Sequence, residues 1–127
     1  MISLTEQDVE FLQYYYHLLD TIEEGFDYIL NSFMEIENIE NNQVFKDILI
    51  AFYYIDSSRT LLEKTFHNDK CLLHSIHKFD EIIELLEDEL RCNISFEQSL
   101  FMKHQLIPAF LNWKASMQTN IKTYVLH

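Results

Sequence analysis

Apolar residues recur along the chain at alternating steps of three and four, the spacing that places them on one face of an α-helix. The clearest series lies in the N-terminal third and holds eight positions without a break: Leu12, Tyr15, Leu19, Ile22, Phe26, Ile29, Phe33 and Ile36. Comparable series run through residues 43–66, 70–90 and 96–125. The pattern predicts four helices, each with one apolar face.

Three short polar segments separate the series, at residues 38–42, 67–69 and 92–94. Ser3 or Thr5 is expected to begin the first helix, and Asp69 has the position of an N-cap for the third. Connections this short make sequential helices antiparallel neighbours. We therefore predict an all-α fold, an up-down-up-down antiparallel four-helix bundle that forms a single domain over residues 1–127.

Two residues that disfavour helices lie inside the predicted ones. Gly25 falls in the first apolar series, where it either lets a neighbouring helix approach closely or marks an exposed position. Pro108 falls in the fourth helix and lacks an N–H, so we expect that helix to be kinked near Pro108. The chain has no other Gly or Pro, which excludes glycine-rich nucleotide loops and turn-rich β folds.

One charged residue interrupts an apolar series. Arg59 lies on the face of the second helix that also carries Ile55 and Leu62. An unpaired buried charge costs several kcal/mol, roughly, so this position calls for a partner or for access to water. We expect a structural ion pair with Asp56, three residues earlier, with acids of the first helix or a side chain reaching into solvent as alternatives.

The charge of the chain is strongly acidic and unevenly distributed. Its 127 residues include 21 Asp and Glu against nine Lys and Arg, a formal net charge of −12. Ten of the acids precede the first basic residue, Lys46. Such a surface repels nucleic acids and anionic membranes, so we expect neither as a partner. A basic or amphipathic protein segment is electrostatically favoured.

Targeting signals and cysteines bear on location. No basic and apolar leader is recognisable, and no apolar run has the length of a membrane span. Cys71 and Cys92 would lie about 30 Å apart on one helix, beyond the reach of a disulfide. Two free thiols suit a reducing compartment, and we expect a cytoplasmic protein.

The strongest candidate for metal chemistry lies on the third helix, where His74, His77 and Glu81 share one face. Neither a Glu-x-x-His nor a His-Glu-x-x-His motif accompanies them. Solvated histidines beside acids explain the pattern as well. We expect no metal or other cofactor, and we keep a metal- or small-ligand-binding bundle using these histidines as the alternative.

Several aromatic residues fall outside the apolar series. On a helix surface such residues are typical of binding sites, because they combine a large apolar area with a polar end. Packing at the edge of a wide core is the alternative, and it applies to Trp113 of the fourth helix as well. With the acids of the first helix they form our candidate partner-binding surface: Tyr14, Glu23, Glu24, Asp27, Tyr28, Tyr53 and Tyr54.

Two segments carry a family resemblance: YYHLLDTIEEG at residues 15–25 and PAFLNWK at residues 108–114. They resemble small uncharacterised all-helical proteins of Gram-positive bacteria, a resemblance that implies no activity. In size, acidity and expected architecture the chain is also similar to bacterial export chaperones such as the flagellar ones. No shared motif supports that second likeness, and a fold by itself does not assign a function.

Taken together, these patterns predict a protein that binds another protein and is not an enzyme. The neighbouring Ser57 and Ser58 lack the glycine-flanked turn of a catalytic serine, and nothing in the sequence builds a dry cleft for paired carboxylates. An adaptor, regulator or chaperone role fits this reading. A homodimer formed through the aromatic surface is a further expectation.

Overall fold

The computed structural model describes residues 4–32, 39–92 and 94–125. All regular secondary structure in these ranges is helical, so the predicted all-α class is confirmed. None of the helices within them combines the length and the apolar character needed to cross a bilayer.

The first long helix, α1, covers Glu6–Ser32. Thr5 Oγ1 accepts a hydrogen bond from the Asp8 N–H at 3.0 Å, and Asp8 Oδ2 accepts one from the Thr5 N–H at 3.0 Å. This reciprocal cap fixes the start that the sequence allowed at Thr5, while Ser3 lies outside the described residues. The six members of the apolar series within α1 are all buried. The last two members fall in the undescribed range 33–38.

Two helices share the region of the predicted second helix. The short η2 (Ile39–Asn41) leads into α2 (Gln43–Ser57), whose N-cap Asn42 accepts from the Phe45 N–H at 3.0 Å. After one residue α3 (Arg59–Thr65) continues. The apolar positions expected for this region are all buried: Phe45, Ile48, Phe52, Ile55, Leu62 and Phe66.

The interruption lies at Ser58, so the prediction of one continuous helix over 43–66 is wrong. The hydroxyls of Ser57 and Ser58 both donate to the Tyr54 carbonyl, at 3.1 and 2.7 Å. Hydroxyls that bond one turn back along a helix compete with its backbone ladder and often bend it. The serine pair thus supplies a physical reason for the interruption.

The next helix, α4, covers Lys70–Arg91 and begins as predicted. Its N-cap Asp69 accepts from the Leu72 N–H at 3.0 Å through Oδ1. The second carboxylate oxygen of Asp69 accepts from the Tyr124 hydroxyl at 2.6 Å, which ties the start of α4 to the C-terminal helix.

Arg59 pairs with α4 and with its own helix α3. Its Nη2 lies 2.8 Å from Asp80 Oδ1 and 3.4 Å from the Ile76 carbonyl, and its Nε lies 3.8 Å from Glu63 Oε1. The prediction of Asp56 as partner is therefore wrong. Asp56 lies in the last turn of α2, before the interruption, whereas Arg59 begins α3 and reaches across to α4.

The chain ends in three consecutive helical segments: α5 (Ser95–Phe101), the π-helix η3 (Met102–Leu106) and α6 (Ile107–Val125). The π-helical turn lies directly before Pro108. In keeping with that geometry, the Ile107 N–H donates to the Met102 carbonyl, five residues back. Pro108 has no N–H for the following ladder position, so the change of helix type coincides with the residue expected to disturb it.

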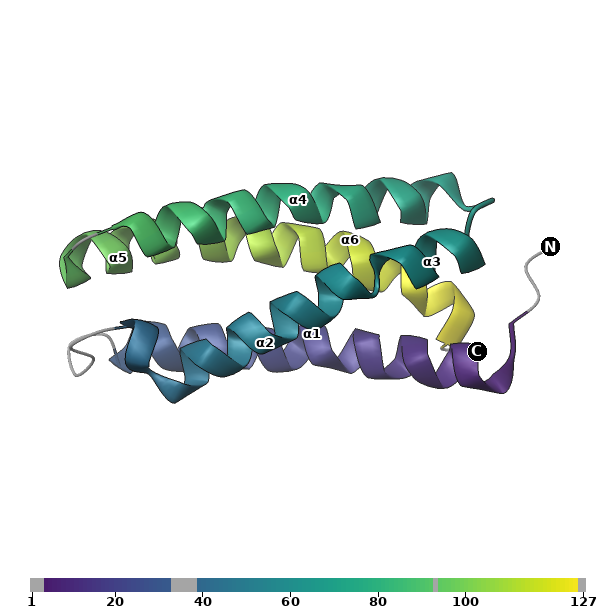
Figure 1. The fold of residues 1–127 in the computed structure, drawn as a ribbon, viewed down its shortest axis with the longest axis horizontal. Coiled ribbons are helices and arrows are strands. Elements are labelled where there is room, and N and C mark those ends of the chain that lie inside the picture. Colours follow the sequence, from purple (N-terminus) through teal and green to yellow (C-terminus); the bar gives the residue numbers. More distant parts are fainter. Residues whose placement is uncertain (1–3, 33–38, 93, 126–127) are drawn as a thin grey trace.

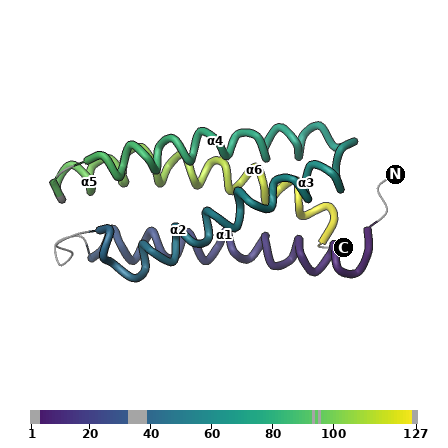
Figure 2. The backbone as a smooth tube through the Cα atoms, viewed as in Figure 1, coloured from purple at the N-terminus to yellow at the C-terminus, as the bar shows by residue number. Residues whose placement is uncertain are grey.

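α1 packs against both α2 and α6, and α4 packs against α6. Figure 1 shows α1 and α4 along opposite long edges of the molecule, with α2 and α3 crossing obliquely from α1 towards α4. The start of α1 and the end of α6 lie at the same end of the molecule, as the tube in Figure 2 also shows.

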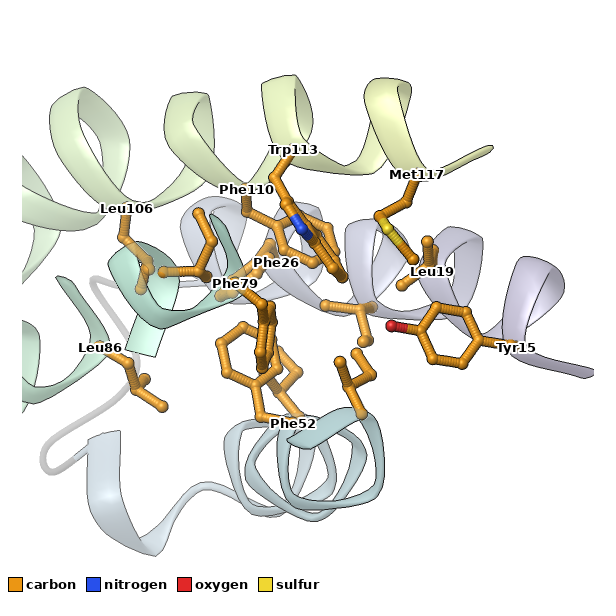
Figure 3. Packing of buried hydrophobic residues seen from close by; sticks show 14 of the residues in the cluster. Tyr15, Leu19, Phe26, Phe52, Phe79, Leu86, Leu106, Phe110, Trp113 and Met117 are labelled. Carbon is orange, nitrogen blue, oxygen red and sulfur yellow. The ribbon is translucent and has the colours of Figure 1, made fainter. Parts of the chain in front are cut away.

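The centre of the core is aromatic (Figure 3). The long helices α1, α2, α4 and α6 each contribute one buried ring to it: Phe26, Phe52, Phe79 and Phe110. Ring centroids lie 5.4 Å apart for both Phe26–Phe110 and Phe52–Phe79. Trp113 packs on Phe79 at 4.7 Å and donates from Nε1 to the Ser75 carbonyl at 2.7 Å. Trp113 is a core residue, so of the two interpretations given for it, packing is the right one.

Candidate functional site

A groove of about 560 Å³ lies between α1 and α2. Both helices line it with mainly apolar side chains and with one acid each, Glu24 and Asp47. The groove brings together four of the seven predicted partner-binding residues: Tyr14, Glu24, Tyr28 and Tyr54. Apart from Tyr54, the sequence did not predict the α2 part of the lining, which includes Val44, Ile48, Ile50 and Ala51.

The two helices approach closely at Gly25. A Cβ on this residue would lie 3.1 Å from Ile48 Cδ1 and 3.4 Å from Val44 Cγ1, tighter than ordinary packing in the first case. Of the two interpretations of Gly25, close helix approach is therefore the right one. Gly25 has no side chain and Ala51 has a small one, so little side-chain volume fills the groove at these two lining positions.

Aromatic rings line both ends of the groove. The rings of Tyr14 on α1 and Tyr54 on α2 meet edge to face, with centroids 5.2 Å apart, while Tyr28 lies fourteen residues further along α1. Tyr14 is 55% exposed and Tyr28 53% exposed, so both rings are open to a partner. Burial, followed by the neighbouring Tyr14, raises the pKa of Tyr54, which keeps that phenol neutral.

The acids in and beside the groove make no ion pair within the described part of the chain. Among the ion pairs of residues 4–32, 39–92 and 94–125, none involves Glu24, Asp27 or Asp47. Asp47 does accept a hydrogen bond from the Gln43 amide at 2.9 Å, which leaves its charge in place. No Lys, Arg or His lines the groove. The two charged residues that line it, Glu24 and Asp47, are therefore both negative.

Glu23 belongs to the opposite flank of α1. Its Oε1 lies 2.6 Å from Nζ of Lys114 on α6, and the same ammonium lies 2.8 Å from Asp20 Oδ1. Hydrogen bonds from Lys114 and then Gln118 lower the pKa of the Asp20 carboxyl. Glu23, which the sequence placed among the partner-binding residues, is therefore paired with a cation of this chain and does not line the groove.

Two further predicted residues lie beside the groove without lining it. Tyr53 is the most exposed large apolar residue described, at 75%, and Asp27 is exposed on α1. Ile50, which does line the groove, is 66% exposed. The exposed apolar surface therefore extends from the groove over the outer side of α2.

The metal-site alternative finds no geometric support. His74, His77 and Glu81 are all exposed on α4, and His77 Nε2 lies 3.7 Å from Glu63 Oε1. In the part of the chain that the structure describes, no three His, Cys, Asp or Glu side chains converge as metal ligands do. Both cysteines are free.

One unusual acid escaped the sequence reasoning. Glu89 of α4 is completely buried, and neither of its carboxylate oxygens has a hydrogen-bond partner. Burial raises its pKa from about 4.5 to about 8. Its position could have been found from the sequence, since it follows Ile82 and Leu86 at the spacing of the buried face.

Comparisons with known proteins identify a family. Residues 10–116 match the family described as Domain of unknown function (DUF8042). The chain belongs to this family, because the match spans most of its length.

One relative is the Uncharacterized protein YvzG of Bacillus subtilis (strain 168), 25% identical over 122 residues. That alignment covers 95% of this chain and 97% of the relative. No solved structure matches the chain. The expected resemblance to uncharacterised proteins of Gram-positive bacteria is confirmed, and neither printed name states an activity.

Proposed function

We propose that this member of the DUF8042 family is a non-catalytic protein-binding module of the cytoplasm, acting as an adaptor, regulator or chaperone. The groove between α1 and α2 would receive a segment of a partner protein. The observation that carries the proposal is the coincidence, in one place, of an open apolar groove with exposed tyrosines and unpaired acids.

Each of these features favours a macromolecular partner. Tyrosines that are half exposed at the rim supply apolar contact area and hydroxyls at little cost in side-chain entropy. The side chains of Tyr53 and Ile50 extend the apolar area beyond the groove itself. A contact that continues over the flat outer side of α2 suits a protein segment better than a small ligand enclosed in a pocket.

We further propose that the framework is an up-down-up-down antiparallel four-helix bundle whose C-terminal helix is kinked near Pro108. The path of the chain in Figure 2 supports it, because α1, α2 with α3, α4 and α6 reverse direction in turn. The π-helical turn at Met102–Leu106 supports the position of the kink. In such a bundle the groove lies on an outer surface, between the first two helices.

The chemistry of the lining supports a role without catalysis. The groove holds carboxylates, phenols and one threonine, but no imidazole, thiol or amine that could serve as a base or nucleophile. Glu24 and Asp47 are both exposed to water. Paired carboxylates act as acid and base in a dry cleft, whereas these two side chains are in contact with water.

The test is capture of a partner in a way that depends on the groove. Ala51→Trp places an indole in the groove, and Ala115→Trp makes the same change at an exposed position of α6. Each protein is cross-linked in cells of the native host, purified, and its partners identified. We expect the same partner with the wild type and Ala115→Trp, reduced at least tenfold with Ala51→Trp.

Circular dichroism checks that both variants are folded before the comparison is made. Equal capture by all three proteins would refute the groove as the binding site. Sedimentation of the purified wild type covers the dimer interpretation: a concentration-dependent dimer that Ala51→Trp abolishes would assign the groove to a second copy instead.

A further inference from the structure

We infer that the segment bound in the groove is an amphipathic helix of about four turns from another protein, whose Lys or Arg side chains meet Glu24 and Asp47. This inference rests on the proposed function and adds the conformation and charge of the partner. Three features of the groove support it: its course along the helices, its lining and the uneven neutralisation of the acids on α1.

The groove follows the helix axes. Its lining positions on α1 are spaced at helical steps from Tyr14 to Tyr28, and those on α2 run from Val44 to Tyr54. At 1.5 Å per residue the α1 edge is about 21 Å long. Neighbouring contacts put Tyr14 beside Tyr54 and Gly25 beside Ile48, so the two edges run antiparallel. A third helix of similar length can lie along the groove between these two edges.

The size and lining of the groove suit one face of such a helix. A volume of about 560 Å³ holds several side chains but not a whole helix with its backbone. Leu18, Ile48 and Ala51 offer an apolar base for side chains spaced three and four apart. The backbone of the bound helix would then remain above the rim, between the tyrosines.

The charges around α1 indicate the sign of the charge that the partner carries. On the α6 flank, Lys114 of the same chain forms ion pairs with Asp20 and Glu23, at 2.8 and 2.6 Å. On the α2 flank, Glu24 and Asp47 both line the groove, and each precedes by one residue a member of the close contact between Gly25 and Ile48. No ion pair of the described residues includes these two acids. A partner can supply the cation that α6 supplies on the other flank.

The position of the acids also gives the bound helix a direction. Glu24 lies ten residues from Tyr14 and four from Tyr28, so both acids belong to the Tyr28 end of the groove. The basic side chains of the partner are therefore expected near Tyr28. A second copy of this chain is a poor occupant, since each copy carries a net charge of −12.

Two synthetic peptides test the inference. Both are labelled amphipathic helices of fourteen residues with the same leucine face, one with lysines on its polar side and one with glutamates. Fluorescence anisotropy with the full chain is expected to give at least tenfold tighter binding of the lysine peptide, with affinity falling as salt rises.

Variants separate specific binding from general attraction. Glu24→Gln with Asp47→Asn is expected to weaken the lysine peptide at least fivefold, and Ala51→Trp at least tenfold. Glu81→Gln with Glu84→Gln removes the same charge from the exposed face of α4 and is expected to leave affinity within twofold. The exposed position of all four acids keeps these double variants folded.

A spin label on a lysine peptide with its charges at one end tests the direction. The label at the basic end should broaden the backbone amide signals of Tyr28 and Val44 more than those of Tyr14 and Tyr54. Equal binding of both peptides, or equal loss in the Glu81/Glu84 control, would overturn the inference. The groove-dependent capture of a native partner would be unaffected by that result, so the two proposals fail separately.

Discussion

The acids on the two flanks of α1 differ in whether this chain supplies a cation that pairs with them. Towards α6, Asp20 and Glu23 converge on Lys114, and Gln118 adds hydrogen bonds to the Tyr16 carbonyl and to Asp20, both at 3.0 Å. Towards α2, small residues leave a groove and its acids have no cation. The acids of the first flank are paired within the chain, whereas those of the second flank are the ones that we propose meet a partner.

The difference teaches that acidity alone does not mark a binding surface. Ten acids precede Lys46 in the sequence, yet some of them serve to hold the fold together. A partly buried ion pair stabilises only when its geometry is good, and Lys114 is 13% exposed with two short contacts. Acids kept in water without a cation contribute little to stability and are free to meet a partner.

The largest effect on stability is expected from a substitution in the hydrophobic core. Phe110→Ala removes a completely buried ring that contacts Phe26 and Phe52, with centroids 5.4 and 5.9 Å away. We expect a loss of about 3–5 kcal/mol in the free energy of unfolding. Leu18→Ala, in the groove, is the matched truncation on the open flank, and urea titration should show a loss of less than about 2 kcal/mol. Equal losses in the free energy of unfolding for the two variants would contradict the expected difference between the core and the groove.

Glu89, whose carboxyl group is buried and unpaired, is expected to make stability depend on pH. Its pKa is about 8 in the folded protein against about 4.5 ordinarily, so the unfolded chain ionises first and stability falls as pH rises between these values. The slope is about 1.4 kcal/mol per pH unit. Glu89→Gln should remove it, leaving the variant similar to the wild type near pH 4.5 and more stable at pH 8.

Thermal unfolding of both proteins from pH 4.5 to 9 measures this difference. Glu84→Gln on the exposed face of α4 serves as the control and should retain the wild-type slope. A pH dependence that survives Glu89→Gln would assign it to another group. The comparison sharpens the interpretation of the groove, whose solvated acids are expected to show no such penalty.

Lys114→Met removes the cation that pairs with the two acids on the α6 side of α1. Asp20 and Glu23 would then face a partly buried position without a cation, and we expect a loss of about 1–2 kcal/mol at pH 7. Because the pKa of Asp20 is lowered in the fold, its contribution exists above its ordinary value of 3.8 and is lost as pH falls below it. The difference between the two proteins should therefore narrow near pH 3. Lys46→Met, at an exposed site on α2, should change stability by less than about 0.5 kcal/mol.

The smallest effect is expected on the open flank. Glu24→Gln with Asp47→Asn should leave the free energy of unfolding within about 0.5 kcal/mol of the wild type. The same double variant is expected to weaken the lysine peptide, so stability and binding would separate. A large destabilisation would mean that these acids hold the fold, as Glu23 does, and the contrast between the flanks would disappear.

Much of the fold was accessible from the sequence because burial repeats with the helix period. The series from Leu12 to Ile29 and from Phe45 to Phe66 are buried as predicted, and Asp69 caps α4. The interruption at Ser58 was not predicted, because two serines acting on one carbonyl leave the apolar period intact. Glu89 was overlooked because a charged residue is expected at the surface, although its spacing along the helix places it on the apolar face.

The sequence by itself determined which faces of the helices are apolar, where most helices begin and which tyrosines remain at the surface. It also determined the excess of acids near the N-terminus. Only the tertiary structure decided which acids are neutralised, because Lys114 lies ninety-one residues from Glu23 in the chain and 2.6 Å from it in space. The same holds for Arg59 with Asp80 and for the groove between α1 and α2. Local spacing fixes the face on which a side chain lies, whereas its partner depends on how the helices pack.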